Sequence, residues 1–236
     1  MSNKPLALVF GGSRGIGAAC VQALLRDGHD VALTYVKSAP ELPDGARAYQ
    51  ADVRDAASVA KAFADAQRDF GRAPGVVIAN AGINVPPGPL AQFGDEPFRQ
   101  LVEVNIVGAF NVLREAARQV TDGGAIIAIT TSMVRHAVPG AGPYSATKGA
   151  VECLVRSMAK ELAGRGVRVN AVAPGPVDTE LFRAGKNAEA LARSAAISPF
   201  NRVGTPAEVA EVVSFLVSDK ASWVHGQIVQ PNGGMV

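Results

Sequence analysis

Short, wholly apolar segments alternate with amphipathic ones along almost the whole chain of 236 residues. Leu6–Phe10 is an apolar run between Pro5 and Gly11, which predicts a buried strand. The segment that follows, 16–26, repeats apolar residues every three or four positions, as an amphipathic helix does. Strands of this kind alternating with helices indicate βαβ units. The sequence therefore predicts an α/β fold with a doubly wound, parallel, seven-stranded sheet and helices on both faces.

The same pattern predicts a single domain, residues 1–236, in which strands and helices alternate. The predicted strands are 6–10, 30–35, 46–51, 75–79, 125–130, 167–172 and 228–230, and the predicted helices are 16–26, 55–70, 98–119, 143–164 and 206–217. Asp55 is suited to cap the second of these helices. Residues 36–45 lack a helical pattern, so a loop is expected between two strands. Residues 176–205 mix Gly, Pro and charge after a strand, and we expect them to form a lid over a substrate site.

Charge and cysteine content argue against several classes of protein. The net charge is +2 and no run of Lys and Arg exceeds two residues, so we expect no nucleic-acid partner. No apolar run approaches about 18 residues, and the segment before Gly11 is short for a signal peptide, so no membrane partner is expected. Cys20 and Cys153 are too few for a disulfide framework or a metal site. We therefore expect reduced cysteines, no metal and a cytoplasmic location.

A glycine-rich turn joins the first predicted strand to the first helix: Gly11-Gly12-Ser13-Arg14-Gly15-Ile16-Gly17. Glycines here let the backbone approach a pyrophosphate, and the helix N-terminus that follows favours its negative charge. The same residues fit Gly-x-Ser-x-Gly, the nucleophile elbow of serine hydrolases, with Ser13 as nucleophile. That alternative needs an oxyanion donor from an earlier loop and a histidine partner. Only ten residues precede Gly11, and neither His136 nor His225 has a recognisable setting, so we favour phosphate binding.

Tyr144 and Lys148 stand four residues apart at the start of a predicted helix. Four residues turn a helix by about 400°, so both side chains leave the same face. A lysine ammonium and a helix N-terminus both favour the phenolate, so we expect a lowered tyrosine pKa. A tyrosine of this kind exchanges a proton with an alcohol or a carbonyl near neutral pH.

Motifs at the ends of the predicted strands occur in an order and spacing that resembles the short-chain dehydrogenase/reductase superfamily. They are Gly11/Gly15/Gly17, Asp52-Val53, Asn80-Ala81-Gly82, Asn105, Ser132, Tyr144 with Lys148, and Pro174-Gly175 with Thr179. The resemblance covers nearly the whole chain. It implies a Rossmann-like fold and an oxidoreductase that transfers a hydride between a nicotinamide cofactor and a carbonyl or secondary alcohol, as a 3-oxoacyl reductase or similar ketone reductase does. A family member that binds the cofactor without catalysis is an alternative.

The resemblance also implies which residues would contact the cofactor. The pyrophosphate would be held by the turn, namely Gly11, Ser13, Arg14, Gly15, Ile16 and Gly17. The adenosine half would be lined by Asp52, Val53, Asn80, Ala81 and Gly82. The nicotinamide and its carboxamide would be covered by Pro174, Gly175, Val177 and Thr179.

Four catalytic residues are implied by the same resemblance. Tyr144 would be the general acid/base, and Lys148 would bind the nicotinamide ribose and tune Tyr144. Asn105 would hold a water in a proton relay, and Ser132 would hydrogen-bond the substrate oxygen. Ser132 precedes Tyr144 by twelve residues, whereas the family commonly has thirteen, so its assignment assumes a one-residue deletion in the intervening loop. Thr131, at the thirteen-residue spacing, offers the same hydroxyl chemistry.

The end of the second predicted strand indicates which nicotinamide is used. A site that prefers NAD places a carboxylate there, on the ribose 2′-hydroxyl. That position is Tyr35, and no acid occurs between Val31 and Pro40. Arg14 in the turn and Lys37 just past the strand are placed to reach a 2′-phosphate. We predict that NADP(H) is preferred, with NAD(H) still usable.

Three features depart from the family pattern. Phe10 stands where the family has a threonine, so that hydroxyl's structural hydrogen bond is expected to be lost. The segment 36–45 is shorter than usual, which removes the helix normally found there. Asn232 replaces the more usual aspartate near the end of the chain, a change to which the sequence attaches no function.

The two long predicted helices, 98–119 and 143–164, carry more apolar residues than one sheet face needs. Those apolar residues include Val102, Ile106, Val151, Leu154 and Val155. The resemblance implies that these helices pack across a two-fold axis. We therefore expect a homo-oligomer, a tetramer.

Overall fold

The computed structural model describes residues 4–236, and a seven-stranded sheet lies at its centre. All neighbouring strands are parallel, in the order β3-β2-β1-β4-β5-β6-β7. The strands are β1 (Leu6–Phe10), β2 (Asp30–Tyr35), β3 (Ala46–Gln50), β4 (Val76–Ala79), β5 (Ala125–Ile129), β6 (Arg168–Val172) and β7 (Ile228–Val229). The predicted doubly wound parallel sheet is confirmed.

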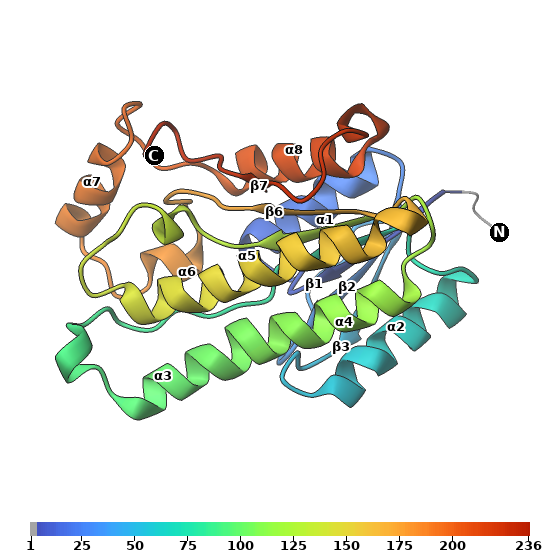
Figure 1. Ribbon diagram of the computed structural model, residues 1–236, viewed down its shortest axis with the longest axis horizontal. Coiled ribbons are helices and arrows are strands. Elements are labelled where there is room, and N and C mark those ends of the chain that lie inside the picture. Colours follow the sequence, from blue (N-terminus) through green and yellow to red (C-terminus); the bar gives the residue numbers. More distant parts are fainter. Residues whose placement is uncertain (1–3) are drawn as a thin grey trace.

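Helices pack against both faces of the sheet (Figure 1). The α-helices are α1 (Gly15–Arg26), α2 (Ala56–Phe70), α3 (Asp95–Leu101), α4 (Ala109–Gln119), α5 (Gly142–Leu162), α6 (Glu180–Arg183), α7 (Ala188–Ala196) and α8 (Pro206–Val217). Helices α1 and α8 share one hydrophobic cluster, and α2, α4 and α5 share the other. Because successive strand residues point to opposite faces, β1 contributes to both clusters and is buried along its whole length.

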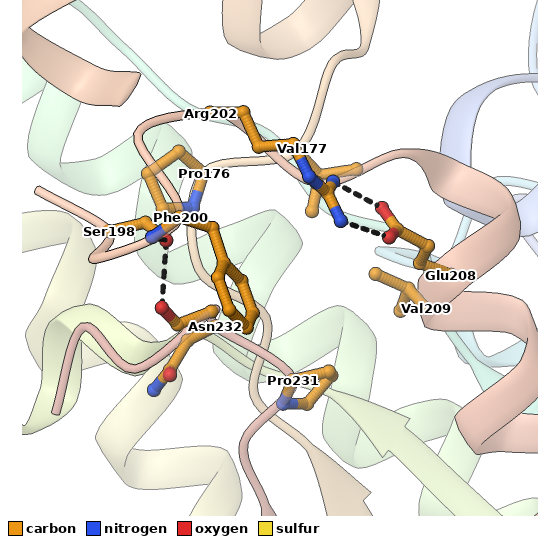
Figure 2. A pocket seen from close by; sticks show the side chains of 11 residues that line it. Pro176, Val177, Ser198, Phe200, Arg202, Glu208, Val209, Pro231 and Asn232 are labelled. Carbon is orange, nitrogen blue, oxygen red and sulfur yellow. Dashed lines mark hydrogen bonds and ion pairs between the residues drawn. The ribbon is translucent and has the colours of Figure 1, made fainter. Parts of the chain in front are cut away.

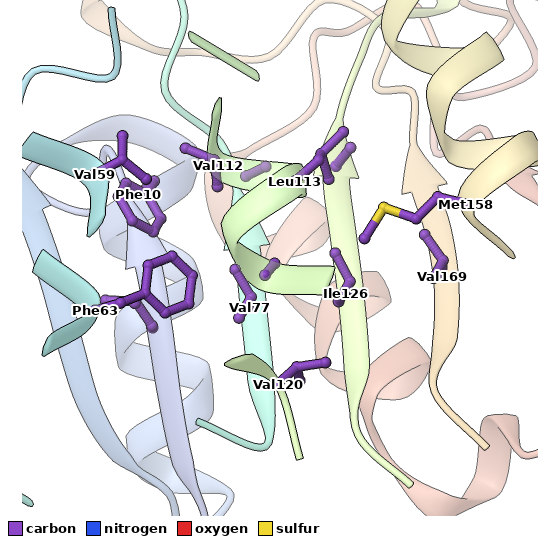
Figure 3. Packing of buried hydrophobic residues seen from close by; sticks show 14 of the residues in the cluster. Phe10, Val59, Phe63, Val77, Val112, Leu113, Val120, Ile126, Met158 and Val169 are labelled. Carbon is purple, nitrogen blue, oxygen red and sulfur yellow. The ribbon is translucent and has the colours of Figure 1, made fainter. Parts of the chain in front are cut away.

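The cluster beneath α2, α4 and α5 shows how the layers interlock (Figure 3). Phe10 of β1 and Phe63 of α2 lie with their ring centroids 5.5 Å apart, and both are fully buried. Phe10 therefore supplies core volume at the position where the family has a hydroxyl. Asp55 caps α2 as predicted, since its side chain accepts a hydrogen bond from the backbone N–H of Ala57 at 2.9 Å.

The strand order reverses between β1 and β4, because the chain runs from β1 outward to β3 and then returns to the other side of β1. In open α/β sheets, ligands bind beyond the carboxyl ends of the strands at such a reversal. The glycine turn follows β1 and residues 80–82 follow β4, so both lie at this place.

Two segments refine the sequence-based description. Residues 36–45 form bends and turns, which confirms the loop expected between β2 and β3. The helix predicted over 98–119 instead begins at Asp95 and contains a π-helical segment, η2 (Val102–Gly108), between α3 and α4. A π turn holds an extra residue relative to an α turn and often marks a functional position.

The predicted lid, 176–205, contains the short helices α6 and α7. Its two ends are held together by a parallel bridge between Val177 and Gly204. Within residues 4–236, every helix is too short or too polar to cross a bilayer.

Candidate functional site

The glycine turn is shaped by close packing against the neighbouring strands. Gly11 has φ +73°, a conformation that favours glycine, and a Cβ there would lie 2.8 Å from the Cα of Ala81. A Cβ on Gly17 would lie 2.1 Å from the carbonyl oxygen of Gly11. Asn80 Nδ2 donates to that same carbonyl at 2.8 Å, which ties the end of β4 to the turn. These contacts hold the start of α1 against the sheet.

Thr34 supplies a contact that sequence reasoning missed. Its Oγ1 accepts a hydrogen bond from the backbone N–H of Gly11 at 3.0 Å, and its carbonyl accepts one from Gly12 at 3.1 Å. The available signal was a single hydroxyl residue in the otherwise apolar interior of β2. A threonine hydroxyl on β2 thus anchors the turn although Phe10 replaces the usual one on β1.

The N-terminus of α1 fits a pyrophosphate. Its N-cap residue, Arg14, makes no side-chain capping bond in the described structure. The first N–H groups of a helix need acceptors, and a phosphate supplies them. Gly15, at φ +56°, and the partly exposed Ser13 and Ile16 complete the turn, with no bulky side chain on Gly15 to block a ligand.

Asn105 and Lys148 converge beside Gly82. A Cβ on Gly82 would lie 3.1 Å from Lys148 Nζ and 3.2 Å from Asn105 Oδ1, so glycine leaves room for both side chains. Asn105 is fully buried in the π-helical segment. Its Oδ1 accepts from the backbone N–H of Ile83 at 2.9 Å, and its Nδ2 donates to the carbonyl of Ile83 at 3.0 Å and lies 3.2 Å from Thr147 Oγ1. The segment after β4 is therefore fixed against α5.

Tyr144 and Lys148 both lie in the first turns of α5, as predicted, but burial dominates their ionisation. Burial raises the pKa of the Tyr144 phenol to about 12 and lowers the pKa of the Lys148 ammonium to about 8. Lys148 Nζ donates to the carbonyl of Ile129 at 3.0 Å, at the end of β5. The expected lowering of the tyrosine pKa is therefore wrong, because burial of the phenol disfavours its charged form.

Ser132 and Thr131 follow β5 in very different surroundings. Ser132 is fully buried; its Oγ donates to the carbonyl of Ala173 at 2.7 Å and accepts from Asn232 Nδ2 at 3.2 Å. Thr131 remains 7% exposed, and its Oγ1 accepts only a long bond, 3.3 Å, from the N–H of Met133 among the described contacts. The contact of Asn232 with Ser132 is a second one that sequence reasoning missed. The available signal was that asparagine stands where the family more usually has aspartate.

The predicted adenosine contacts surround the carboxyl ends of β2 and β3. The Asp52 carboxylate is hydrogen-bonded by the Arg54 guanidinium, which lowers the pKa of that carboxyl despite partial burial. Val53 is buried against Gly108, where a Cβ would lie 2.6 Å from its side chain. Tyr35 ends β2 half-buried, and Lys37 is exposed two residues later.

The segment after β6 packs between β5 and the end of the chain. The carbonyl of Pro174 accepts from the N–H of Ser132 at 2.9 Å, and Gly175 N–H donates to Pro231 at 3.1 Å. Val177 is buried at the start of the lid. Thr179 caps α6 through a bond from the N–H of Phe182 at 3.1 Å, and its methyl lies 3.4 Å from where a Cβ on Gly15 would be. The lid thus reaches the glycine turn.

A cavity of about 140 Å³ lies beside this segment, between the two ends of the lid, the start of α8 and the tail after β7. Figure 2 shows the ring of Phe200 beside it, the ion pair of Arg202 with Glu208, and Ser198 hydrogen-bonded to the tail. Ser198 Oγ donates to the carbonyl of Gly233 at 2.7 Å. The lid's far end is therefore anchored to the C-terminal tail.

His225 cannot be the catalytic base that the serine hydrolase alternative needs. Its Nδ1 accepts from the N–H of Val169 at 3.1 Å, which leaves Nε2 as the protonated nitrogen that donates to the carbonyl of Ala159 at 2.7 Å. Both ring nitrogens of His225 are thus used by the backbone, so His225 has no nitrogen left to activate Ser13.

Comparison with known proteins agrees with the geometry. Residues 11–236 match the family described as Enoyl-(Acyl carrier protein) reductase. A Picea abies protein named short-chain type dehydrogenase/reductase is 39% identical over 98% of this chain and 92% of its own length. An NADPH-dependent aldehyde reductase-like protein of Arabidopsis thaliana is 39% identical over 98% of this chain and 94% of its own. The 3-oxoacyl-(acyl-carrier-protein) reductase MabA of Mycobacterium tuberculosis is 38% identical over 97% and 91%.

Solved structures give the same result. A short-chain dehydrogenase from Burkholderia cenocepacia, in complex with NADP, superposes with a TM-score of 0.88 at 31% identity, covering 98% of this chain and 97% of the other. A blue fluorescent protein from a metagenomic library, in complex with NADPH, gives a TM-score of 0.89 at 31% identity, covering 99% and 98%. Both the sequence matches and the fold thus extend over nearly all of the chain, which belongs to the short-chain dehydrogenase/reductase superfamily of oxidoreductases acting on carbonyl and alcohol groups with NAD(P).

Proposed function

We propose that this chain is an NADP(H)-dependent oxidoreductase that interconverts a carbonyl and a secondary alcohol, with a 3-oxoacyl group or a similar ketone as substrate. The observation that carries the proposal is that Lys148 Nζ and Asn105 Oδ1 converge on Gly82. Lys148 follows Tyr144 by one turn of α5. This cluster lies at the carboxyl end of β4, next to the glycine turn. Relatives named as 3-oxoacyl and aldehyde reductases support the reaction class.

The preference for NADP(H) is supported by charge around the end of β2. Tyr35 stands where a site that prefers NAD has a carboxylate. Arg14 is exposed in the turn, and Lys37 is exposed just past the strand. Both offer positive charge to a 2′-phosphate. The relatives that carry NADPH in their names and the solved structures that contain NADP or NADPH support the same preference.

The ionisation of Tyr144 suits the reductive direction. The bound nicotinamide supplies the hydride, and the substrate oxygen then needs a proton. With a pKa of about 12, the Tyr144 phenol is protonated near neutral pH and is ready to donate that proton. Lys148 has a pKa of about 8, so most of it is cationic at pH 7, and its charge stabilises the phenolate that the donation leaves. Asn105, fixed through Ile83, would position the water that returns a proton.

We assign the hydroxyl that binds the substrate oxygen to Thr131 rather than Ser132. Ser132 has no exposed surface, and its hydroxyl already donates to Ala173 and accepts from Asn232. A hydroxyl has one proton to donate, so Ser132 could bind a substrate only by abandoning Ala173. Thr131 stands at the family spacing of thirteen residues before Tyr144 and donates to no acceptor in the described structure.

A panel of ketones and 3-oxoacyl thioesters, assayed with NADPH and NADH by the loss of absorbance of the reduced cofactor, tests the reaction. Fluorescence titration of each cofactor tests the preference separately. We expect NADPH to bind at least about tenfold more tightly than NADH, which corresponds to about 1.4 kcal/mol. Tight NADPH binding with no turnover on any carbonyl would point to a non-catalytic member of the family.

We also propose that the chain acts in the cytoplasm. We further propose that it forms a homo-oligomer, a tetramer, through α3, α4 and α5. Val151 and Val155, which seemed surplus in the sequence, are buried in the chain's own core and cannot supply the interface. Phe98 and Phe110, 44% and 43% exposed on α3 and α4, support an interface there instead. Light scattering at micromolar concentration tests the assembly, and a monomeric particle would contradict it.

A further inference from the structure

Arg14 belongs to the glycine turn and also contacts the lid. Its Nη1 lies 3.6 Å from a carboxylate oxygen of Glu180, the first residue of α6. The two side chains are 74% and 81% exposed, so the ion pair is open to solvent. Next to Glu180, Thr179 lies against Gly15, which brings this end of the lid onto the turn. One guanidinium therefore links the two segments.

The other charged side chains on and beside α6 do not contact Arg14 in the described structure. Asp178 pairs with Arg183 at 2.8 Å, which neutralises both within the lid. Lys186 lies over the ring of Phe182, 4.2 Å from its centroid. Among the lid carboxylates of the described structure, Glu180 is thus the one that forms an ion pair with Arg14.

We propose that Glu180 competes with the 2′-phosphate of NADP(H) for Arg14 and so limits the preference for NADP(H) over NAD(H). This inference rests on the cofactor assignment made under Proposed function. A guanidinium that turns to a phosphate for charge-assisted hydrogen bonds must leave the Glu180 carboxylate, so the free energy of the Arg14–Glu180 pair is lost when that cofactor binds. NAD(H) carries no 2′-phosphate, so its binding leaves the Arg14–Glu180 pair intact. Glu180 therefore weakens the binding of one cofactor and not of the other.

Replacement of Glu180 by glutamine, E180Q, tests the competition by equilibrium fluorescence titration of NADPH and NADH without substrate. Ion pairs between exposed side chains are weak. We therefore expect E180Q to bind NADPH about two- to fivefold more tightly, equivalent to about 0.4–1 kcal/mol, with an unchanged Kd for NADH. The gain should shrink as salt is raised, because screening weakens interactions between exposed charges.

Two further variants identify the cause. In an Arg14→Ala background, E180Q should give no additional gain, because the shared guanidinium is absent. Glu189→Gln is the matched control: Glu189 is another exposed lid carboxylate, but it pairs with Arg193 within α7 at 2.6 Å. Its NADPH affinity should equal that of the wild type.

An unchanged or weaker NADPH affinity in E180Q would overturn the proposal, as would an equal change for NADH or a gain that persists without Arg14. A wild type that binds NADH as tightly as NADPH would instead contradict the cofactor preference itself. The two failures are therefore read from different measurements.

Discussion

The assignment of Thr131 and Ser132 can be tested by separating stability from turnover. Ser132→Ala removes a fully buried hydroxyl and leaves the Ala173 carbonyl and Asn232 Nδ2 without their partner. A buried polar group left unpaired costs about 1–3 kcal/mol; at about 1.5 kcal/mol for each, the two groups cost about 3 kcal/mol. In a chain of 236 residues this corresponds to a Tm lower by about 6–12 °C. Turnover at 25 °C should stay close to that of the wild type.

Thr131→Val should show the opposite pattern. The shape of the side chain is kept, and the described structure loses only the long capping bond from Met133. Loss of a cap costs about 1 kcal/mol. Removal of one hydrogen-bond donor from a reacting oxygen lowers turnover by about 10²–10³-fold. Thr131→Ser keeps the hydroxyl and should restore most of the turnover.

Steady-state kinetics at 25 °C and thermal unfolding on the same preparations supply both quantities. The reasoning would be refuted if Ser132→Ala lost turnover while folded, and Thr131→Val kept it. That result would mean that Ser132 leaves Ala173 when substrate binds. It would also return the catalytic hydroxyl to the twelve-residue spacing.

Three other outcomes follow from the structure. Tyr144→Phe should keep the NADPH affinity measured by fluorescence and lower turnover by at least about 100-fold, because only the transferable proton is lost; near wild-type turnover would remove Tyr144 from the reaction. Burial lowers the pKa of Lys148 to about 8, below its value in the unfolded chain. Above pH 8 the unfolded state therefore binds more protons than the folded state. The free energy of unfolding should then rise by up to about 1.4 kcal/mol per pH unit. Urea titrations at pH 7.5 and 9.5 should show this rise in the wild type and not in Lys148→Met; equal slopes would contradict it. Gly17→Ala would place a Cβ 2.1 Å from the Gly11 carbonyl oxygen and should lower the free energy of unfolding by about 3 kcal/mol. Gly164→Ala, where a Cβ would meet open space, should leave the melting curve nearly unchanged.

The sequence predicted the strands more closely than the helices. The bounds of β1 and β2 agree with prediction at both ends, because apolar runs between Pro, Gly and charged residues have sharp limits. The helix predicted at 98 starts earlier, since Asp95 and Glu96 favour a helix N-terminus although they are polar. Its π-helical segment has no signature in apolar spacing.

The candidate site was predicted by residue type but not by environment. Spacing placed Tyr144 and Lys148 on one helical face, yet it could not show that burial would dominate their pKa values. The same limit affected Val151 and Val155, whose apolar character fits a core and an interface equally well. Contacts between distant segments, such as Arg14 with Glu180, depend on how the lid folds back, which no local pattern encodes.

The π-helical segment sets the angular phase of the long helical rod formed by α3, η2 and α4. Leu101 and Ala116, one on each side of it, are both fully buried, fifteen residues apart. A regular α-helix turns by about 1,500° over that length, about 60° past four complete turns. The wider turn offsets this excess, and Leu101 of α3 and Ala116 of α4 are both buried. Deletion of one residue between 102 and 108 would therefore rotate α3 against α4 and swing Asn105 away from Ile83, changing the chemistry of the site without altering any residue in it.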